Sequence, residues 1–232
     1  MARLNVTAEG NTEQQFAIQV LQPHLAGRGV YLVKPRLGAI AKKKGHVHRG
    51  GLARYLPARN DIQRWLKQDR DSDAFFTTMF DLYGLPKDFP SFSEAAKEND
   101  PYSRVAKLEE ALAEDIGDTR FIPYIQLYEF EALLLAEPQA FACRFDRHEK
   151  QIESLTALCK QYESPELIDD GEQTAPSKRI GREIPEYLAA KPTAGPIIAA
   201  EIGLDTLRAK CPHFSEWLTK LEGLATLSAD SP

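Results

Sequence analysis

The sequence has 232 residues, 43% hydrophobic and 27% charged, which is typical of a globular chain. Its 29 basic and 34 acidic residues give a net charge of -5, which excludes a uniformly basic nucleic-acid coat but permits a local basic patch. Without a long apolar run, a signal-peptide core or a C-x-x-C pair, the chain is expected to be cytoplasmic, with no membrane segment, disulfide framework or zinc knuckle.

The amino-terminal part predicts the start of an α/β fold. Alternating apolar and polar residues predict a strand over 3–8. Thr12 and Gln15 have the spacing of a capping box, so a helix is expected to begin at Thr12 and to end near 27–29. A second strand is predicted over 30–34. A strand, a helix and a strand within about 35 residues indicate a layered α/β fold.

The middle of the chain contains the most hydrophobic predicted strand. Residues 74–80 read Ala-Phe-Phe-Thr-Thr-Met-Phe, a run typical of a central strand covered on both faces. A helix over about 52–69 precedes it, and a helix over 102–116 follows it with apolar residues on one face. A further strand is expected over 120–127.

The remaining chain is expected to be mostly helical. A short helix is predicted over 129–135, and two helices, over roughly 196–210 and 213–221, close the chain. The acidic segment 163–172 is expected to be a solvated loop. No internal repeat or low-complexity tract divides the sequence, so one domain is predicted.

Acidic residues follow two of the predicted strands. Glu9 comes at the end of the first strand, Glu13 lies in the first turn of the next helix, and Asp81 ends the central strand. Ligands of open α/β sheets bind outside the carboxyl ends of the strands, so these carboxylates are expected to converge. Because three acids repel one another, the pattern favours a hard divalent cation such as Mg²⁺. Such an ion polarises a phosphoryl oxygen or generates hydroxide.

A glycine-rich segment over 36–54 has no acidic residue. Its cationic side chains and histidines are expected to contact the phosphates of a nucleic acid, and the alternative is a merely solvated loop. These residues are Arg36, Lys42, Lys43, Lys44, His46, His48, Arg49 and Arg54.

Several blocks carry a resemblance to a known family. Glu9-Gly10-Asn11-Thr12-Glu13 resembles the E-G-x-T-E signature of TOPRIM-like domains in overcoming-lysogenisation-defect nucleases and related phage-defence proteins. Blocks at 81–86, 124–134 and 175–180 resemble the DUF4276 family, a TOPRIM-related group, and residues 211–218 resemble its ending. The likeness covers nearly the whole chain.

The resemblance implies a fold, an activity and a partner. The fold is a TOPRIM-like open, mainly parallel sheet with helices on both faces, with a core over about 1–135 and a mostly helical extension over about 136–232. The activity is cleavage of phosphodiester bonds with Mg²⁺ or Mn²⁺. The sequence lacks a G-x-x-x-x-G-K-[ST] phosphate loop, so any energy-dependent step needs a partner. The resemblance suggests an AAA- or ABC-type ATPase in an anti-phage system.

The resemblance also implies roles for individual residues. Glu9 matches a general base or metal ligand, and Asp81 matches the first acid of a D-x-D motif whose third position is here Tyr83. Glu129 or Glu131 is expected to replace the missing carboxylate. Residues two apart on a helix point about 200° apart, so only one of the pair is expected to reach the metal. Glu131 is the preferred ligand and Glu129 the preferred orienting residue.

Lys178 corresponds in this resemblance to a lysine that stabilises transition-state charge. The predicted protein is therefore a metal-dependent endonuclease or nickase acting on DNA or RNA. Two alternatives stay open: a degenerate, non-enzymatic module that binds an ATPase partner or nucleic acid, and a small-molecule phosphohydrolase. The choice between DNA and RNA, the sequence specificity and the oligomeric state, including a homo-oligomer, also stay open.

Overall fold

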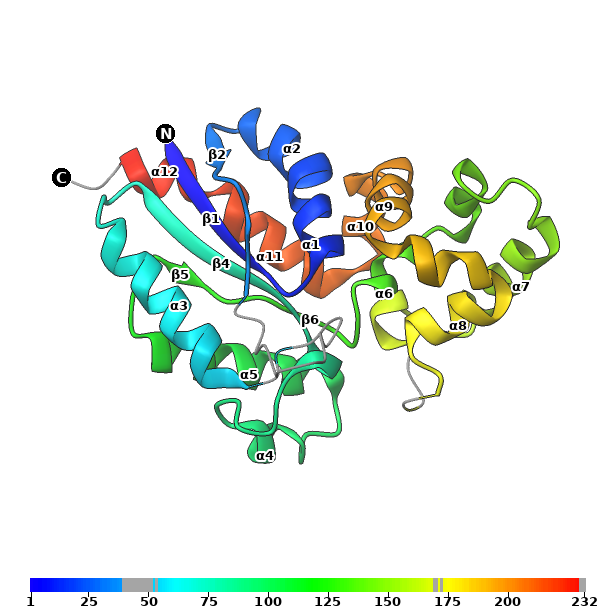
Figure 1. Cartoon of the computed structure of the whole chain (residues 1–232), viewed down its shortest axis with the longest axis horizontal. Helices are drawn as coiled ribbons and strands as arrows, with labels where there is room; N and C mark the ends of the chain where they lie inside the picture. The colour runs from blue at the N-terminus through cyan, green and yellow to red at the C-terminus, as the bar shows by residue number, and fades with distance from the viewer. Residues whose placement is uncertain (39–51, 53, 169–170, 172, 230–232) are drawn as a thin grey trace, which may run out of the picture.

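The computed structural model describes residues 1–38, 52, 54–168, 171 and 173–229. The strands of this part are β1 (Ala2–Ala8), β2 (Val30–Leu32), β3 (Arg36–Leu37), β4 (Ala74–Asp81), β5 (Phe121–Ile122) and β6 (Ile125–Gln126). They form one sheet in the order β2-β1-β4-β5, with β3 paired to β1 and β6 paired to β4 (Figure 1). Each pairing is parallel, which confirms the predicted open, mainly parallel sheet.

Strand β4 is the central strand that its apolar run predicts. Successive side chains of a strand point to opposite faces, so Phe75 and Met79 join one hydrophobic cluster while Phe76 and Phe80 join another. Leu4 of β1 lies opposite Phe75 in the parallel register and continues the first face. The sheet is therefore buried on both sides.

Helices cover both faces, as predicted. The face of Phe75 packs against α1 (Asn11–Phe16), η1 (Ala17–Leu21), α2 (Gln22–Ala26), α11 (Pro212–Glu222) and α12 (Leu224–Ala229). The face of Phe76 packs against α3 (Tyr55–Gln68) and α5 (Pro101–Ile116). Residues between these elements form η2 (Leu82–Gly84) and α4 (Phe92–Ala95).

The remaining helices lie to the right of the sheet in Figure 1. They are α6 (Glu131–Leu134), η3 (Pro138–Cys143), α7 (Glu149–Cys159), η4 (Pro165–Leu167), α8 (Pro176–Glu183), α9 (Pro185–Ile202) and α10 (Leu204–Lys210). The predicted helical extension is thus present. Its boundary near residue 135 and the single-domain organisation stay predictions.

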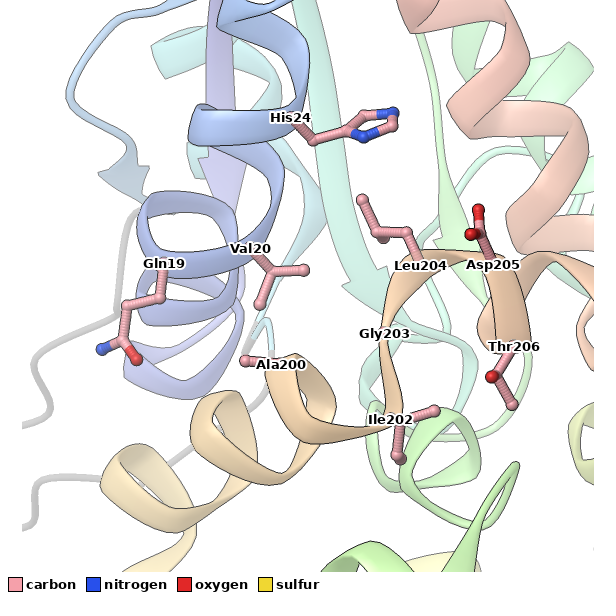
Figure 2. A pocket seen from close by; sticks show the side chains of 9 residues that line it. All are labelled: Gln19, Val20, His24, Ala200, Ile202, Gly203, Leu204, Asp205 and Thr206. Atoms are coloured by element: carbon pink, nitrogen blue, oxygen red, sulfur yellow. The ribbon is translucent and has the colours of Figure 1, made fainter.

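A surface hollow of about 540 Å³ lies between the π-helical turn η1 and the junction of α9 with α10 (Figure 2). Its lining residues are Gln19, Val20, His24, Ala200, Ile202, Gly203, Leu204, Asp205 and Thr206. The lining includes no predicted site residue from the described chain, so the hollow is separate from the strand-end acids.

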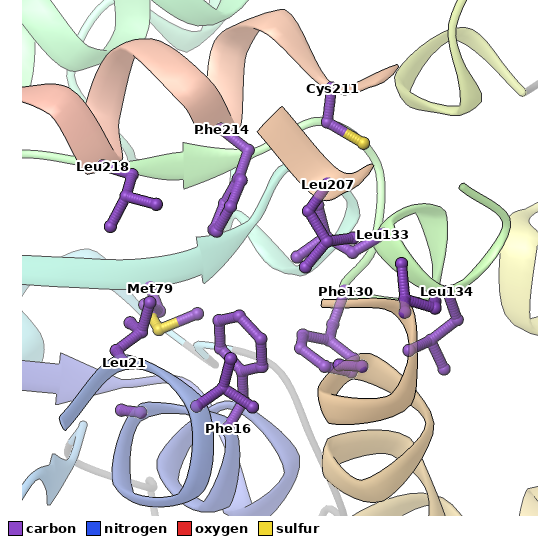
Figure 3. Packing of buried hydrophobic residues seen from close by; sticks show 14 of the residues in the cluster. Phe16, Leu21, Met79, Phe130, Leu133, Leu134, Leu207, Cys211, Phe214 and Leu218 are labelled. Carbon is purple, nitrogen blue, oxygen red and sulfur yellow. The ribbon is translucent and has the colours of Figure 1, made fainter. Parts of the chain in front are cut away.

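One hydrophobic cluster joins the sheet to the C-terminal helices (Figure 3). Phe16 of α1 packs edge-on against Phe130, with ring centroids 5.3 Å apart, and against Phe214 of α11 at 6.1 Å. Phe16, Phe130 and Phe214 are almost completely buried. The first helix, the segment after β6 and the penultimate helix therefore share one packing centre.

The predicted start of the first helix and the predicted helix over 196–210 differ from the structure. The first helix begins at Asn11, one residue before the predicted start. Its capping hydrogen bond runs from the Gly10 backbone N–H to the Glu13 carboxylate, whereas the sequence predicts a capping box of Thr12 and Gln15. The helix predicted over 196–210 is divided: α9 begins earlier, at Pro185, and ends at Ile202. Gly203, with a φ of 78°, separates it from α10. Proline inside a helix usually disrupts it, but α9 contains Pro192 and Pro196.

The predicted solvated loop 163–172 is partly buried, with 169–170 and 172 outside the described residues. Glu166 is fully buried and accepts hydrogen bonds from the backbone N–H groups of His213 and Phe214, at 3.0 and 2.9 Å. A carboxylate at the start of a helix satisfies N–H groups that lack intrahelical partners. Glu166 therefore caps α11.

The strand predicted over 120–127 is divided into β5 and β6. Throughout the described chain, we find no helix whose length and apolar character would let it cross a membrane.

Candidate active site

The acids at the ends of β1 and β4 meet at the carboxyl edge of the sheet. Glu9 directly follows β1, and its Oε2 accepts a hydrogen bond of 2.8 Å from the Asp81 backbone N–H. This contact joins residues 72 positions apart in the sequence. It follows from the parallel register, in which Ala8 lies opposite Met79.

Gly84 allows Glu9 to take this position. A Cβ atom at residue 84 would lie 2.3 Å from Glu9 Oε1 and 2.7 Å from Glu9 Oε2, closer than non-bonded atoms approach. Any side chain at residue 84 would therefore displace the carboxylate of Glu9. The glycine in the Asp81–Pro86 block thus positions a site residue.

Glu13 is the buried acid of the first helix. Its Oε2 accepts a hydrogen bond of 2.8 Å from the Gly10 backbone N–H. Burial raises the pKa of Glu13 to about 7, and the negative charge of Glu131 adds to the shift against the opposing hydrogen bonds. This carboxyl group therefore titrates near neutral pH.

Glu129 and Glu131 follow β6 and have different partners. Glu129 Oε2 accepts a hydrogen bond of 2.8 Å from the Ser177 backbone N–H in the first turn of α8. Glu131 Oε1 is 3.0 Å from Lys191 Nζ and accepts a 3.0 Å hydrogen bond from the Tyr187 hydroxyl. The two carboxylates are thus held by α8 and α9 respectively. Which of them reaches a metal stays a prediction.

Asp81 interacts electrostatically with these acids, and one of its oxygens is buried. Among the described residues, its Oδ1 has no hydrogen-bond partner. Burial raises the pKa of Asp81 well above its usual value, and the negative charges of Glu9, Glu13, Glu131 and Glu129 raise it further. An unpartnered carboxylate oxygen in such surroundings is costly to ionise unless a cation compensates the charge.

The side chains of the site offer the type of ligand atom that a hard divalent cation prefers. All five acids offer carboxylate oxygens, the ligands that Mg²⁺ prefers. In the described part of the chain, no three His, Cys, Asp or Glu side chains are already grouped closely enough to hold a metal ion. Binding would therefore require glutamate side chains to turn towards the buried oxygen of Asp81.

One lysine contacts a site acid, and the predicted lysine follows a residue that does. Lys191 is half-buried on α9 and pairs with Glu131. Burial lowers the pKa of Lys191, but the charges of Glu131, Glu129 and Asp81 outweigh burial and raise it. Lys178, the residue expected from the sequence, is exposed in the first turn of α8 and directly follows Ser177.

Of the eight cationic and histidine residues named in the predicted basic segment, only Arg36 and Arg54 are described. Arg36 is exposed on β3 opposite Thr7 of β1, near the carboxyl edge of the sheet, and its guanidinium carbon lies 3.9 Å from the Trp65 ring centroid. Arg54 is exposed immediately before α3. The residues outside the described chain are Lys42, Lys43, Lys44, His46, His48 and Arg49.

Tyr187 and Lys191 contact the site but were not predicted from the sequence. Both side chains contact Glu131 from one helix, where residues four apart share a face. This i, i+4 spacing is the signal that could have linked them to each other. The sequence contains no comparable signal linking α9 to Glu131.

Comparisons with known proteins extend this description. The family model described as "Domain of unknown function (DUF4276)" matches residues 8–222. One similar solved structure is the C-terminal region of the OLD protein from Xanthomonas campestris pv. campestris, with 16% sequence identity and a TM-score of 0.45. The similarity covers 100% of this chain and 99% of that chain. No curated protein matches the sequence significantly.

Proposed function

Since the chain belongs to the DUF4276 family and has an acidic site at the carboxyl edge of its sheet, we propose that it is a metal-dependent endonuclease or nickase. Its substrates would be phosphodiester bonds of DNA or RNA. The family description assigns no activity, so the proposal depends on the site. The observation that carries it is the buried, unpartnered Oδ1 of Asp81 among four glutamates of the described chain.

The contacts of the acidic side chains suggest which of them hold the metal and which transfer protons. Glu9, Asp81 and one of Glu129 and Glu131 would hold Mg²⁺ or Mn²⁺. Bound there, the ion would activate water and stabilise negative charge on the phosphoryl oxygens. Glu13, held by the Gly10 backbone N–H next to these acids, would take part in proton transfer.

Cationic side chains would balance the remaining charge. Lys191 holds Glu131 in a defined position through the 3.0 Å ion pair. Lys178 is exposed at the start of α8, where it is available to a phosphate group. Arg36, near the same edge of the sheet, would contact the substrate backbone together with the rest of the basic segment.

We propose in addition that the nuclease acts with an ATPase partner of the AAA or ABC type in defence against phage. The support for this step is the resemblance of the sequence blocks together with the missing phosphate loop. Because a partner could control activity, metal binding is a better first test than cleavage.

The first test is calorimetric titration of Mn²⁺ and Mg²⁺ into wild type, Glu9→Gln and Asp81→Asn. We expect binding by the wild type and at least ten-fold weaker binding by each variant, because each loses a charged ligand. Glu153→Gln removes an exposed acid on α7 and is the matched control, expected to bind as the wild type does. Equal binding by all four proteins would rule out the proposed metal site.

Cleavage of plasmid, single-stranded DNA and RNA is then compared between wild type and Glu9→Gln. The proposed activity predicts products with the wild type and at least a hundred-fold slower cleavage with the variant. Full activity of a folded Glu9→Gln protein would remove the nuclease hypothesis.

A degenerate, non-enzymatic module is the second candidate. Tyr83 occupies the position where the D-x-D motif has its second acid, and the described acids are not grouped for metal binding. This candidate predicts no measurable Mn²⁺ binding by the wild type, the outcome that would favour it over the nuclease.

A further inference from the structure

An aromatic pair borders the acidic site. Tyr83 follows Asp81 by two residues and directly precedes Gly84, which lies against the Glu9 carboxylate. Tyr128 directly precedes Glu129. The Tyr83 backbone N–H donates a hydrogen bond of 3.1 Å to the Tyr128 carbonyl oxygen, and the ring centroids are 5.5 Å apart. The pair therefore joins the loops that follow β4 and β6.

The two rings differ in exposure. Tyr128 is 9% exposed and has a φ of 60°, a left-handed conformation that is uncommon for a bulky residue. Tyr83 is 42% exposed, although large aromatic side chains usually bury most of their surface. Tyr128 thus supports Tyr83, which is partly exposed two residues after Asp81.

We propose that Tyr83, supported by Tyr128, is a stacking platform for an unpaired nucleobase, so that the preferred substrate is single-stranded or locally unpaired nucleic acid. This inference rests on the proposed nuclease function. Aromatic side chains bind single strands because every base offers a π-face, whereas paired bases in a duplex are already stacked. A base on Tyr83 would place a neighbouring phosphate close to Glu9 and Asp81.

The test measures binding without hydrolysis. A short single strand with a phosphorothioate backbone carries one 2-aminopurine, and its affinity is measured by fluorescence anisotropy in Mg²⁺. Stacking on tyrosine also quenches the 2-aminopurine. We expect the wild type to bind and quench, Tyr83→Ala to bind about ten-fold more weakly without quenching, and Tyr83→Phe to retain both properties.

Tyr31→Ala is the matched control. Tyr31 is 50% exposed but lies on β2 opposite Arg3, at the amino end of the sheet. We expect this variant to bind the strand as the wild type does. A fully abasic strand of the same length should bind wild type and Tyr83→Ala equally, because it offers no base that could stack. If Tyr83→Ala does not fold, Tyr83→Leu keeps the bulk of the side chain and should still lose quenching.

Three results would overturn the inference: no quenching by the wild type, unchanged binding by Tyr83→Ala, or a loss with Tyr83→Phe equal to that with Tyr83→Ala. Strand binding and quenching by a protein that binds neither Mn²⁺ nor Mg²⁺ would refute the metal-dependent nuclease while leaving the stacking platform in place. Cleavage of a single strand that does not depend on Tyr83 would refute the platform alone.

Discussion

At the scale of single residues, Glu9 and Gly84 depend on each other. The carboxylate of Glu9 accepts a hydrogen bond from the Asp81 backbone and occupies the space where a side chain of residue 84 would lie. Position 84 therefore controls where the first acid of the site points, although it contributes no functional group.

Gly84→Ala should displace the Glu9 carboxylate without unfolding the protein, because the atoms that clash belong to the end of a flexible side chain. We expect Mn²⁺ affinity to fall about ten-fold while the melting temperature changes little. Calorimetry with parallel thermal melts measures both quantities.

Gly223→Ala is the control for this substitution. Gly223 has ordinary helical backbone angles, and a Cβ atom there would lie 3.6 Å from its nearest neighbour. Its metal affinity should equal that of the wild type. A Gly84→Ala protein with wild-type affinity would show that Glu9 is not a ligand in its present position.

At the scale of elements, α11 is fixed to the sheet by polar contacts as well as by packing. Trp217 stacks on Tyr124 with ring centroids 4.1 Å apart, and its Nε1 donates to Thr77 Oγ1 at 2.9 Å. Glu166 caps the same helix at its start. These contacts determine the position of Phe214, which packs next to Phe16 of the helix carrying Glu13.

Trp217→Phe should lower the free energy of unfolding by about 2 kcal/mol, because a buried hydrogen bond and packed volume are lost. Denaturant titration measures the change. In a Thr77→Val background the same substitution should cost less, since the hydrogen bond is already absent. Equal costs in the two backgrounds would show that the hydrogen bond contributes nothing.

The first turn of α11 contains His213, a titratable residue in contact with Glu109. His213 Nε2 lies 3.0 Å from Glu109 Oε1 and 3.2 Å from the Ile125 carbonyl oxygen. Burial lowers the pKa of His213, but the hydrogen bond and charge of Glu109 outweigh burial and raise it above 6.5. Since the folded-state pKa is the higher one, this contact stabilises the protein fully below pH 6.5 and loses its effect as the pH rises through the folded-state pKa.

Glu109→Gln should therefore flatten the decline in stability above pH 6.5. Denaturant midpoints measured from pH 5.5 to 8.5 on both proteins test this expectation. An equally steep decline in the variant would mean that another group titrates.

The sequence predicts elements whose pattern is local and misses those that depend on distant partners. The alternation in β1 and the apolar run in β4 are sufficient to place Glu9 and Asp81 at one edge of a parallel sheet. The buried Glu166 could not be predicted, because α11 stabilises it from 47 positions away. Likewise, the partners of Glu131 come from α9, whose two internal prolines argue locally against a long helix.

At the scale of the whole molecule, folding brings several acidic side chains close together at the carboxyl edge of the sheet. Burial and four neighbouring glutamates raise the pKa of Asp81. Such repulsion opposes folding in the absence of a cation, and a ligand that binds only the folded state reverses the effect by mass action.

Asp81→Asn should raise the melting temperature in metal-free buffer, because an amide cannot ionise and so escapes both the burial penalty and the repulsion from the neighbouring glutamates. Mn²⁺ at about a hundred times its dissociation constant should stabilise the wild type by about 2.7 kcal/mol and leave the variant unchanged. Thermal melts with and without EDTA test both expectations. If the variant is less stable than the wild type in EDTA, the carboxyl group of Asp81 does not destabilise the metal-free protein.

The order of the site residues along the chain has a consequence for protein synthesis. A ribosome releases the amino-terminal strands first, so β1 and β4 can pair while α9 is still untranslated. Glu131 acquires Tyr187 and Lys191 only when α9 emerges. A nascent chain that ends before α9 therefore has Glu131 without the two side chains that hold it, so the proposed site can be complete only after most of the chain has been translated.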